Sequence, residues 1–589
     1  MPSRLQALRQ KMRQAGIQAC LIPSTDPHQS EYVAEHWQLR SYFSGFTGSA
    51  GKLLITLDRA ALWTDGRYFL QAEQQLPPDI LLMKEGLPET PSIPAWLQHN
   101  LQQGDTLGID GWQFSHQQYS TLKKQLQDKN LDIRIDFNPW NELWPDRPPL
   151  PDTPIFDFSE EFAGESREKK LQRLRKNMFE RNIDYLLLAA LDEIAWLFNL
   201  RGRDVHCNPV FYAYALIGQD KALLFLPYAS ASKCPSELQA HLAKAGIQIH
   251  EYEQITTVLK DKLPSQAKLQ ASWEQVNEML YRALPAHPSD KSTSPVQLMK
   301  AVKNETEIAH TRQAMVTDGI ALFHFYRWLE ETLQHRSVSE AEAAEKINEF
   351  RNEQGDFFGP SFDPIVGFRQ NGAIVHYKAE VENCAQIQAP GMLLIDSGGQ
   401  YPEGTTDITR TTYLGTPSEE EKKHFTLVLK GHIALARAIF PKGTTGCQLD
   451  ILARHALWQE KLNYGHGTGH GVGFFLNVHE GPQRIGPTRS QATLMAGMIT
   501  SNEPGYYLQG HYGIRIENLV LCREAGNGFL EFETLTLFPI QLKLIDKELL
   551  TEEEISWLNA YHQKVYEQLS PKLSEEDRNS LREQTRPIS

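Results

Sequence analysis

Four acidic side chains in the last third of the sequence, with histidines between them, could hold divalent metal ions. An apolar stretch ends in Asp396, a turn containing Gly and Pro follows, and a Thr-rich stretch then carries Asp407. This pattern predicts a β-hairpin centred between Tyr401 and Pro402, in which the two aspartates face each other. Opposed side chains on paired strands have Cβ atoms about 4.5–5.5 Å apart, and like charges there destabilise the sheet. We therefore expect a cation or a shared proton between the two carboxylates.

A second pair of carboxylates shows the same pattern. Glu503 and Glu517 lie symmetrically about Gly510, so a second hairpin would bring them together. Pro504 places Glu503 at the end of a strand. Arg515 is two residues from Glu517 and points to the same face of its strand, so we predict that it pairs with a metal-binding carboxylate.

Histidines lie between and before these hairpins. The glycine-rich segment 464–473 contains His466 and His470, His479 follows it, and His376 precedes the first hairpin. Glycines let the backbone approach a site closely. The segment matches neither of the glycine-rich phosphate-binding patterns nor the H-E-x-x-H pattern of single-zinc peptidases. Phosphate binding and a zinc site of that type are therefore not expected.

Four carboxylates and one imidazole form an oxygen-rich ligand set. Two divalent ions, about 3.5–4 Å apart in such sites, would balance the four negative charges. Such ligands suit Mn²⁺, Co²⁺ or Fe²⁺ at least as well as Zn²⁺. We expect two divalent metal ions, with Mn²⁺ first and Zn²⁺ or Co²⁺ as alternatives.

Proline-rich breaks divide the chain that must position these residues. They lie at 139–154 and 285–295, and the second ends where Ser294 and Pro295 predict the start of a long helix over 296–333. The sequence of 589 residues is too long for one core. A polar segment with helical periodicity, 541–589, ends the chain and is expected to pack on the surface of the preceding domain.

The first two segments resemble each other. Residues 4–12 and 170–178 align without a gap at an offset of 166, each with apolar residues at helical spacing. Gly16 and Asn182 follow at the same offset, and both residue types tolerate the left-handed conformation that ends a helix. A buried strand is predicted after each. We therefore predict two related α/β domains.

Composition excludes several classes of protein. The net charge of −14 does not favour nucleic acid as a partner. No apolar run approaches the roughly 20 residues of a membrane span, and no signal peptide is expected at the N-terminus. The six scattered cysteines form no C-x-x-C pair, which fits a reducing cytoplasm.

The motifs together resemble a known enzyme family. IDSG (395–398), TDITR (406–410), HGTGHGVG (466–473), NEPGYY (502–507) and RIEN (515–518) are similar to the pita-bread catalytic domain of Xaa-Pro aminopeptidases. FSGFTGSAG (43–51), WTDGRYF (63–69) and DEIAWLFNLRG (192–202) resemble the creatinase-like domains of the long, three-domain cytosolic form. The resemblance implies an α/β and α+β multidomain fold: two creatinase-like N-terminal α/β domains (1–145 and 155–290), a pita-bread domain (295–540) and a C-terminal helical extension (541–589).

The resemblance also implies roles for individual residues. It gives the metal ligands as Asp396, Asp407, His470, Glu503 and Glu517, with Asp407 and Glu517 bridging both ions. It gives the catalytic residues as His376, His479 and Glu503, and the substrate-binding residues as His376, His466, His479 and Arg515. It further implies that a hydroxide bridging the metals hydrolyses the bond before a proline in second position. Small peptides as substrates, a homodimer and no membrane or nucleic-acid partner complete this expectation.

Two alternatives stay open. Prolidase acts on Xaa-Pro dipeptides with the same ligand set, whereas methionine aminopeptidase lacks two leading domains of this kind and creatinase does not need the metal ligands. A pita-bread domain can also serve as a binding module without catalysis. Such modules typically lose ligands, and all five ligand positions are filled here.

Overall fold

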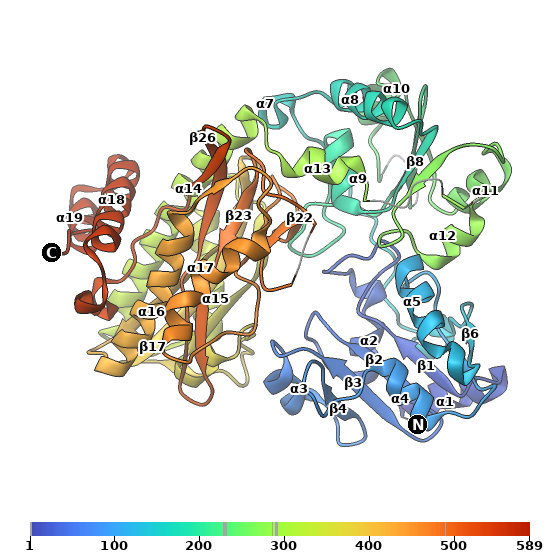
Figure 1. Ribbon diagram of the computed structural model, residues 1–589, viewed down its shortest axis with the longest axis horizontal. Helices are drawn as coiled ribbons and strands as arrows, with labels where there is room; N and C mark the ends of the chain where they lie inside the picture. The colour runs from blue at the N-terminus through green and yellow to red at the C-terminus, as the bar shows by residue number, and fades with distance from the viewer. Residues whose placement is uncertain (1–2, 228–231, 286, 289–292, 489–490) are drawn as a thin grey trace. The chain divides into compact units, whose positions relative to one another are not determined.

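The computed structural model describes residues 3–227, 232–285, 287–288, 293–488 and 491–589. The chain forms two compact units (Figure 1): unit 1 contains residues 1–160 and 165–297, and unit 2 contains residues 161–164 and 298–589. The predicted domain boundaries near 145–155 and 540 stay predictions. Part of the predicted break at 285–295, residues 286 and 289–292, lies outside the described residues. None of the helices in the described ranges combines the length and the hydrophobicity that a membrane span requires.

Among its described residues, unit 1 has two large sheets and one short pair of strands, β7 (Phe156–Asp157) with β9 (Leu200–Arg201). The two large sheets share the same order of five strands, to which the first sheet adds β6. The first has the order β4-β3-β2-β1-β5-β6 and the second β12-β11-β10-β8-β13. In both, the strand that comes first in the chain (β1 or β8) pairs antiparallel with one neighbour and parallel with the other. The strands are β1 Ala19–Ile22, β2 Lys52–Thr56, β3 Ala60–Thr64, β4 Leu81–Lys84, β5 Thr106–Gly108, β6 Asp132–Arg134, β8 Tyr185–Leu188, β10 Tyr214–Gly218, β11 Ala222–Leu226, β12 Ile247–Glu251 and β13 Leu269–Ala271.

The predicted repeat explains this likeness. Helix α1 (Arg4–Ala15) precedes β1, and α8 (Arg167–Glu180) precedes β8. Gly16 (φ 69°) and Asn182 (φ 57°) adopt the left-handed conformation after them, as predicted. The prediction of two related α/β segments is confirmed. The other helices of at least six residues in unit 1 are α2 Leu39–Ser44, α3 Phe69–Gln75, α4 Ile93–Asn100, α5 His116–Leu126, α9 Leu191–Phe198, α10 Ser236–Lys244, α11 Gln254–Asp261 and α12 Glu278–Ala283.

Unit 2 packs long helices along antiparallel sheets (Figure 1). One sheet joins β15 (Gly359–Phe368), β17 (Gly391–Tyr401), β18 (Gly404–Thr405) and β19 (Ile408–Leu414). A second has the order β20-β27-β26-β23-β21-β22, and β24 pairs with β25. These strands are β20 Ile439–Pro441, β21 Gly469–Gly471, β22 Glu480–Ile485, β23 Ile499–Asn502, β24 Gly505–Leu508, β25 Tyr512–Arg515, β26 Asn518–Gly526 and β27 Phe529–Thr534. The helices α14 Glu305–Leu333, α15 Glu340–Asn352, α16 Glu419–Ala436 and α17 Gly446–Gln459 cover them.

The prediction of one long helix over 296–333 is wrong in one respect, because this range forms two helices. Helix α13 begins at Pro295, as predicted, but ends at Ala301, and α14 begins at Glu305. Asn304 caps α14, since its side chain accepts from the backbone N–H of Glu307. Apolar periodicity continues through the break, so the pattern alone did not reveal it.

The C-terminal segment is part of the core of unit 2. Helix α18 (Glu552–Leu569) buries Leu558, Val565 and Leu569 in the same hydrophobic cluster as residues of α14 and α16. Helix α19 (Glu575–Gln584) adds Leu581. The predicted helix is confirmed, but it is integrated more deeply than a surface layer.

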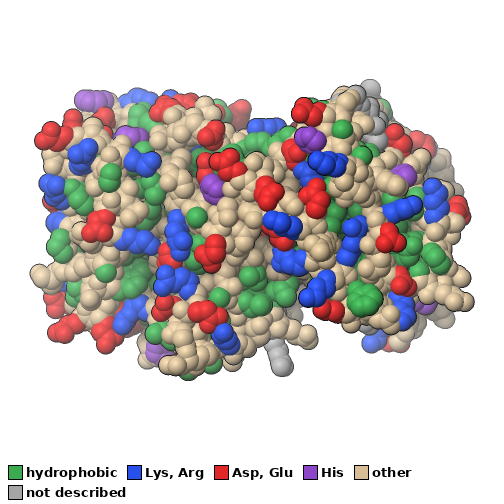
Figure 2. All heavy atoms as spheres, turned by 90° about the horizontal axis from the view of Figure 1, so that it is seen from above, with side chains coloured by type: hydrophobic (Ala, Val, Ile, Leu, Met, Phe, Trp, Pro, Cys, Tyr) green, Lys and Arg blue, Asp and Glu red, His purple; other side chains and the backbone are tan. Residues whose placement is uncertain are grey.

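The exterior mixes charges of both signs. On the face shown in Figure 2, acidic and basic side chains are interspersed among neutral ones. The acidic residues that the sequence singles out are different, because three of the four are buried inside unit 2: Asp396, Asp407 and Glu517.

Candidate metal centre

The first hairpin brings Asp396 and Asp407 to one place. Asp396 lies within β17, and its partner across the sheet is Thr409 in β19. Asp407 directly precedes β19, between the two short ladders that β18 and β19 form with β17. The negative charge of Asp407 contributes to raising the pKa of Asp396, so the two carboxylates are within electrostatic reach of each other.

The predicted register of this hairpin is wrong. Tyr401 pairs with Gly404, so the turn consists of Pro402 and Glu403 rather than being centred between Tyr401 and Pro402. The reversal uses Gly404 at φ 148°, a conformation that favours glycine. Asp396 therefore does not face Asp407 directly, and Asp407 reaches the centre from the irregular step before β19.

The predicted register of the second hairpin is confirmed. Asn502 pairs with Asn518, and the strands β24 and β25 continue the same register on the other side of the glutamates. Glu503 and Glu517 therefore occupy matching positions about Gly510, in the short gap between two ladders. Because no regular strand pairing includes Glu503 and Glu517, their side chains are not restricted to the two faces of a pleated sheet.

His470 lies against two of the carboxylates. Its Nε2 atom is 3.5 Å from Oδ2 of Asp407 and 3.5 Å from Oε1 of Glu503. Its Nδ1 atom is 2.9 Å from the carbonyl oxygen of Gly471, which can only accept a hydrogen bond. Nδ1 therefore carries a hydrogen, and Nε2 is the ring atom that faces the carboxylates and could bind a metal.

Burial and repulsion perturb the charges of the cluster. Burial raises the pKa of Asp396 to about 6, against the opposing charge of Arg515. Burial, followed by repulsion from Asp407, raises the pKa of Glu517 well above its ordinary value. Burial also raises the pKa of Glu503. Although burial lowers it, the carboxylates of Asp407 and Glu503 raise the pKa of His470 to about 9. Without a cation the cluster therefore tends to take up protons.

The donor set fits divalent metal ions. Ligand atoms of Asp407, His470 and Glu517 all lie within 4.8 Å of one another. Among the described residues, Oδ1 of Asp396 is buried without a hydrogen-bond partner, which is unfavourable for an acceptor that nothing else satisfies. Carboxylate oxygens with one imidazole nitrogen are the ligands that such ions take. The residues present therefore fit a centre of two metals.

Arg515 holds the centre from one side. Its Nη2 atom is 2.6 Å from Oδ2 of Asp396, so the predicted pairing with an acidic residue is with Asp396. Its Nε atom donates to the hydroxyl of Thr409 at 3.1 Å, and that hydroxyl donates to Glu517 at 2.8 Å. Arg515 is therefore linked to Glu517 indirectly, through the hydroxyl of Thr409.

Tyr507 is a site residue that the sequence reasoning missed. Its hydroxyl is 2.6 Å from Nη1 of Arg515 and 2.8 Å from Nε2 of His466. Burial raises its pKa to about 12. Glu503, Gly505 and Tyr507 alternate along the chain, and this period of two could have placed Tyr507 on the same side as the glutamate.

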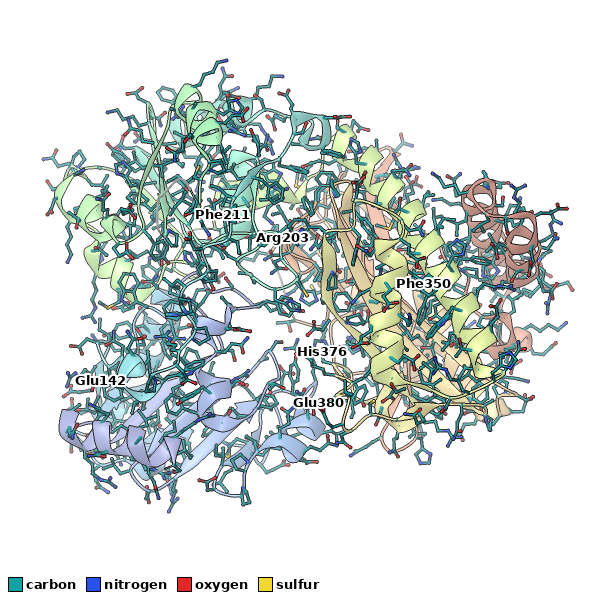
Figure 3. The ribbon with its side chains drawn as sticks, turned by 180° about the vertical axis from the view of Figure 1, so that it is seen from behind. Glu142, Arg203, Phe211, Phe350, His376 and Glu380 are labelled. Carbon is teal, nitrogen blue, oxygen red and sulfur yellow. The ribbon has the colours of Figure 1, made fainter. Side chains whose placement is uncertain are left out.

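Two of the remaining predicted histidines contact residues of the centre, and the third lies in a loop that Arg515 contacts. His466 contacts Tyr507, as described, and the ring of His479 lies edge-on to that of His470, with centroids 4.4 Å apart. His376 lies in the loop after β15 (Figure 3), and Nη2 of Arg515 is 3.4 Å from the carbonyl oxygen of the preceding Val375. All three histidines are partly buried.

A buried carboxylate holds the loop of His376. Glu340, at the start of α15, accepts hydrogen bonds from the hydroxyl of Tyr377 at 2.8 Å and from the side chain of Asn371. It also accepts from the backbone N–H groups of Phe368 and Ala385, both at 2.7 Å. These contacts fix both ends of the loop, so the position of His376 depends on a residue that does not enter the site.

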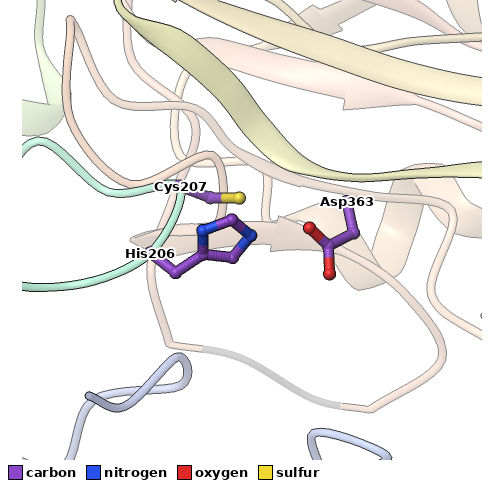
Figure 4. Close-up of side chains that lie close together, drawn as sticks. All are labelled: His206, Cys207 and Asp363. Carbon is purple, nitrogen blue, oxygen red and sulfur yellow. The ribbon is translucent and has the colours of Figure 1, made fainter. Parts of the chain in front are cut away.

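Figure 4 shows three further residues with metal-binding groups. His206 and Cys207 are neighbours in the chain of unit 1, whereas Asp363 belongs to β15 of unit 2. Because they come from different units, no metal site is assigned to them.

Substitution of Gly469 should disrupt the centre. A Cβ atom at Gly469 would lie 1.9 Å from the carbonyl oxygen of Ser501, so β21 and β23 would have to separate. Ser501 bonds both the backbone of His470 and the side chain of Glu503. We expect Gly469→Ala to lower the free energy of unfolding by about 1–3 kcal/mol and to reduce bound metal.

The matched control is Gly465→Ala in the same segment, where a Cβ atom would meet nothing within 4 Å. The melting temperature and the bound metal are measured for both variants. Equal behaviour of the two variants would contradict the close approach of β21 and β23.

Removal of one carboxylate should have opposite effects with and without metal. Folding raises the pKa of Glu517, so its contribution to stability falls as pH rises above the ordinary carboxyl range. In chelator-treated protein at about pH 7.5, Glu517→Gln should therefore raise the free energy of unfolding by on the order of 1 kcal/mol, and by less at about pH 5. With metal added, wild type should gain stability and the variant much less.

Thermal unfolding with chelator and with Mn²⁺ checks this reversal of order. The control is Glu524→Gln, at an exposed position in β26, which should leave the stability unchanged in both conditions. A variant less stable than wild type in both conditions would show that Glu517 is not under electrostatic strain.

Family models match nearly the whole chain. Residues 4–136 and 146–307 match two models described as "Creatinase/Prolidase N-terminal domain". Residues 309–524 match "Metallopeptidase family M24", and residues 528–588 match "C-terminal region of peptidase_M24". The expectation of creatinase-like N-terminal domains followed by a pita-bread catalytic domain is confirmed.

Similar proteins extend over the same length. The chain is 42% identical to "Probable Xaa-Pro aminopeptidase P" of Laccaria bicolor over 98% of this chain and 91% of that protein. A crystal structure of X-prolyl aminopeptidase from Caenorhabditis elegans, described as a cytosolic enzyme with a di-nuclear active site, superposes with a TM-score of 0.94 at 36% identity, covering 99% and 98% of the two chains.

A structure of Xaa-Pro dipeptidase from Bacillus anthracis is also similar, with a TM-score of 0.52 at 25% identity, covering 64% of this chain and 99% of the other. The full-length identity and the matched catalytic model lead to one conclusion: the chain belongs to the metallopeptidase family M24.

Proposed function

We propose that this chain is an Xaa-Pro aminopeptidase, which releases the N-terminal residue from small peptides with proline in second position. The observation that carries the proposal is the convergence of four carboxylates and His470 in one centre of unit 2. Relatives that bear this name match the chain from end to end. A binding module without catalysis would not need such a costly cluster of charges.

Asp396, Asp407, His470, Glu503 and Glu517 would hold two divalent metal ions. The description of the C. elegans enzyme as di-nuclear supports the number. The oxygen-rich donor set favours Mn²⁺, with Zn²⁺ or Co²⁺ as alternatives. When bound, the ions supply Lewis acidity and a water molecule activated for attack at neutral pH.

Glu503 would move the proton. It keeps 17% of its side chain exposed, whereas Asp407 keeps 4%, so a substrate can reach Glu503. Its raised pKa suits a group that accepts a proton and gives it up again. The ring nitrogen of proline carries no hydrogen in the peptide, so it must receive one when the bond breaks. We assign that delivery to Glu503.

The histidines and Arg515 would bind and orient the peptide. His479 lies against His470, and His376 lies in the loop that Arg515 contacts. Both would donate hydrogen bonds to the peptide carbonyl as negative charge develops there. His466 would line the pocket of the second residue, where Tyr507 holds its ring. Arg515 is tied to Asp396 and Tyr507, so it would shape the substrate site mainly through these partners.

We also propose a cytoplasmic homodimer. The description of the C. elegans enzyme as cytosolic supports the location. Ile451 (49% exposed) and Trp458 (45% exposed) lie two turns apart on α17, and they are large apolar residues on the surface of unit 2. We expect Trp458→Glu to shift the sedimentation coefficient from dimer toward monomer, and Glu460→Gln, exposed on the same segment, to leave it unchanged. A wild-type monomer at micromolar concentration would contradict the dimer.

A tripeptide comparison tests the activity. Chelator-treated protein should release arginine from Arg-Pro-Pro only after Mn²⁺ is added, and kcat/KM should exceed that for Arg-Ala-Pro by on the order of 100-fold. The reason is that the second pocket would recognise the shape of the proline ring. Release of the N-terminal amino acid, followed by chromatography, is the measurement.

The dipeptide Ala-Pro separates the rival function. Cleavage of Ala-Pro without cleavage of either tripeptide would move the assignment to prolidase, to which the partial match with the Bacillus enzyme points. Bound metal with no cleavage of any of these peptides would overturn the peptidase proposal in favour of a binding module.

A further inference from the structure

A buried arginine lies behind the metal-binding hairpins. Arg410, in β19, is 3% exposed and donates to neutral oxygens. Its three nitrogens lie 2.7–3.0 Å from six such oxygens, which its five N–H groups share: the carbonyls of Thr409, Glu517, Phe538 and Pro539, the side-chain amide oxygen of Asn518 and the hydroxyl of Tyr561. A guanidinium in such a fork is held rigidly, because each of its planar donors has a fixed direction.

Arg410 joins the two hairpins. It follows Asp407 by three residues on the first hairpin, and its Nη1 atom donates to the carbonyl oxygen of Glu517 on the second at 2.7 Å. Its Nη2 atom is 2.8 Å from Oδ1 of Asn518, the next residue. Together with the bond from the backbone N–H of Glu517 to the carbonyl oxygen of Thr409 at 3.1 Å, these contacts of Arg410 hold the strands that carry Asp407 and Glu517 side by side.

Helix α18 of the C-terminal segment reaches this arginine. The hydroxyl of Tyr561, in α18, accepts from Nη2 of Arg410 at 2.8 Å and donates to the carbonyl oxygen of Phe538 at 2.8 Å. Tyr561 is 5% exposed. Its ring stacks on that of Trp557, with centroids 5.4 Å apart and planes at 7°. The stacking on Trp557 restricts the orientation of the Tyr561 ring and so the position of its hydroxyl.

The same region also supports the remaining glutamate. His432, in α16, is 3.1 Å from the carbonyl oxygen of Asn502 through Nδ1, which must donate, so Nε2 accepts from Nδ2 of Asn518 at 3.1 Å. Asn502 directly precedes Glu503. The ring of Trp557 lies against that of His432, with centroids 6.0 Å apart.

We infer that α18 positions the metal ligands, with Tyr561 acting through Arg410. This inference rests on the proposed metal centre and assigns α18 a part in it. Tyr561 does not touch a ligand side chain, so it is a positioning residue. Groups that orient metal ligands typically change metal affinity 10–100-fold when they are removed.

Tyr561→Phe tests the inference, because it removes only the hydroxyl. Metal affinity of chelator-treated protein is measured by competition with a chromophoric chelator for Mn²⁺. We expect at least one of the two metals to bind about tenfold more weakly, the lower end of the range for groups that orient ligands. The rate at saturating Mn²⁺ should recover most of the wild-type value.

Tyr566→Phe is the matched control. Tyr566 lies on the same helix, and its hydroxyl bonds the exposed Arg582. The metal affinity of Tyr566→Phe should stay within about twofold of the wild-type value. A role in stability alone would lower the melting temperature of Tyr561→Phe and leave its metal affinity unchanged, and that result would overturn the inference.

Two further outcomes are distinguishable. Absence of metal binding by the wild type would overturn both the proposed function and this inference, whereas two bound metals with unchanged affinity in Tyr561→Phe would overturn the inference alone. If Tyr561→Phe does not fold, Trp557→Leu removes the stacking partner and keeps the hydroxyl. Trp557→Leu should weaken metal binding several-fold, and unchanged affinity would count against the inference.

Discussion

The repulsion among four carboxylates in one partly buried centre is the constraint on which unit 2 depends. Burial and mutual repulsion both disfavour the charged forms, and the raised pKa values of Asp396 and Glu517 record that cost. The buried guanidinium of Arg515 and the imidazole of His470, whose Nε2 atom faces the carboxylates, offset part of this cost. Two divalent cations would supply the missing positive charge. The centre is therefore built for cations, and its geometry has to be held by the rest of the unit until they arrive.

Several buried polar residues do that holding. Arg351 pairs with Asp318 at 2.8 Å and donates to the hydroxyl of Ser397, which follows Asp396. Glu340 collects the ends of the His376 loop, and Arg410 joins the ligand hairpins. Each of these groups would be unfavourable alone in the interior, but each is bonded to other elements, although Nη1 of Arg351 is buried without a hydrogen-bond partner among the described residues. Buried networks bonded across several elements are rigid, which suits ligands that must keep one arrangement.

The sequence predicted local features better than distant contacts. The hairpin about Gly510 and the left-handed ends at Gly16 and Asn182 were predictable, because they depend on neighbours in the chain. The first hairpin was misplaced because a two-residue turn at Pro402 and Glu403 competes with the turn centred one step earlier, and the sequence contains no stronger signal for either. The contact of Arg410 with Tyr561 spans 151 positions, and nothing in the spacing of either residue announces it. Tyr507 belongs to the motif NEPGYY, but its role depends on contacts with His466 and Arg515 that the sequence does not show.

The burial of α18 also sets an order of events during protein synthesis. Residues 552–569 leave the ribosome after all five ligand residues, but Leu558 and Val565 belong to the same core as the helices behind the ligand strands. A nascent chain adds about 5–20 residues each second, so the ligand strands wait for a few seconds without their last packing partner. During that interval the carboxylates repel one another without the full support of the core. We therefore expect the centre to mature late in translation, which leaves metal loading as one of the final steps in making the enzyme.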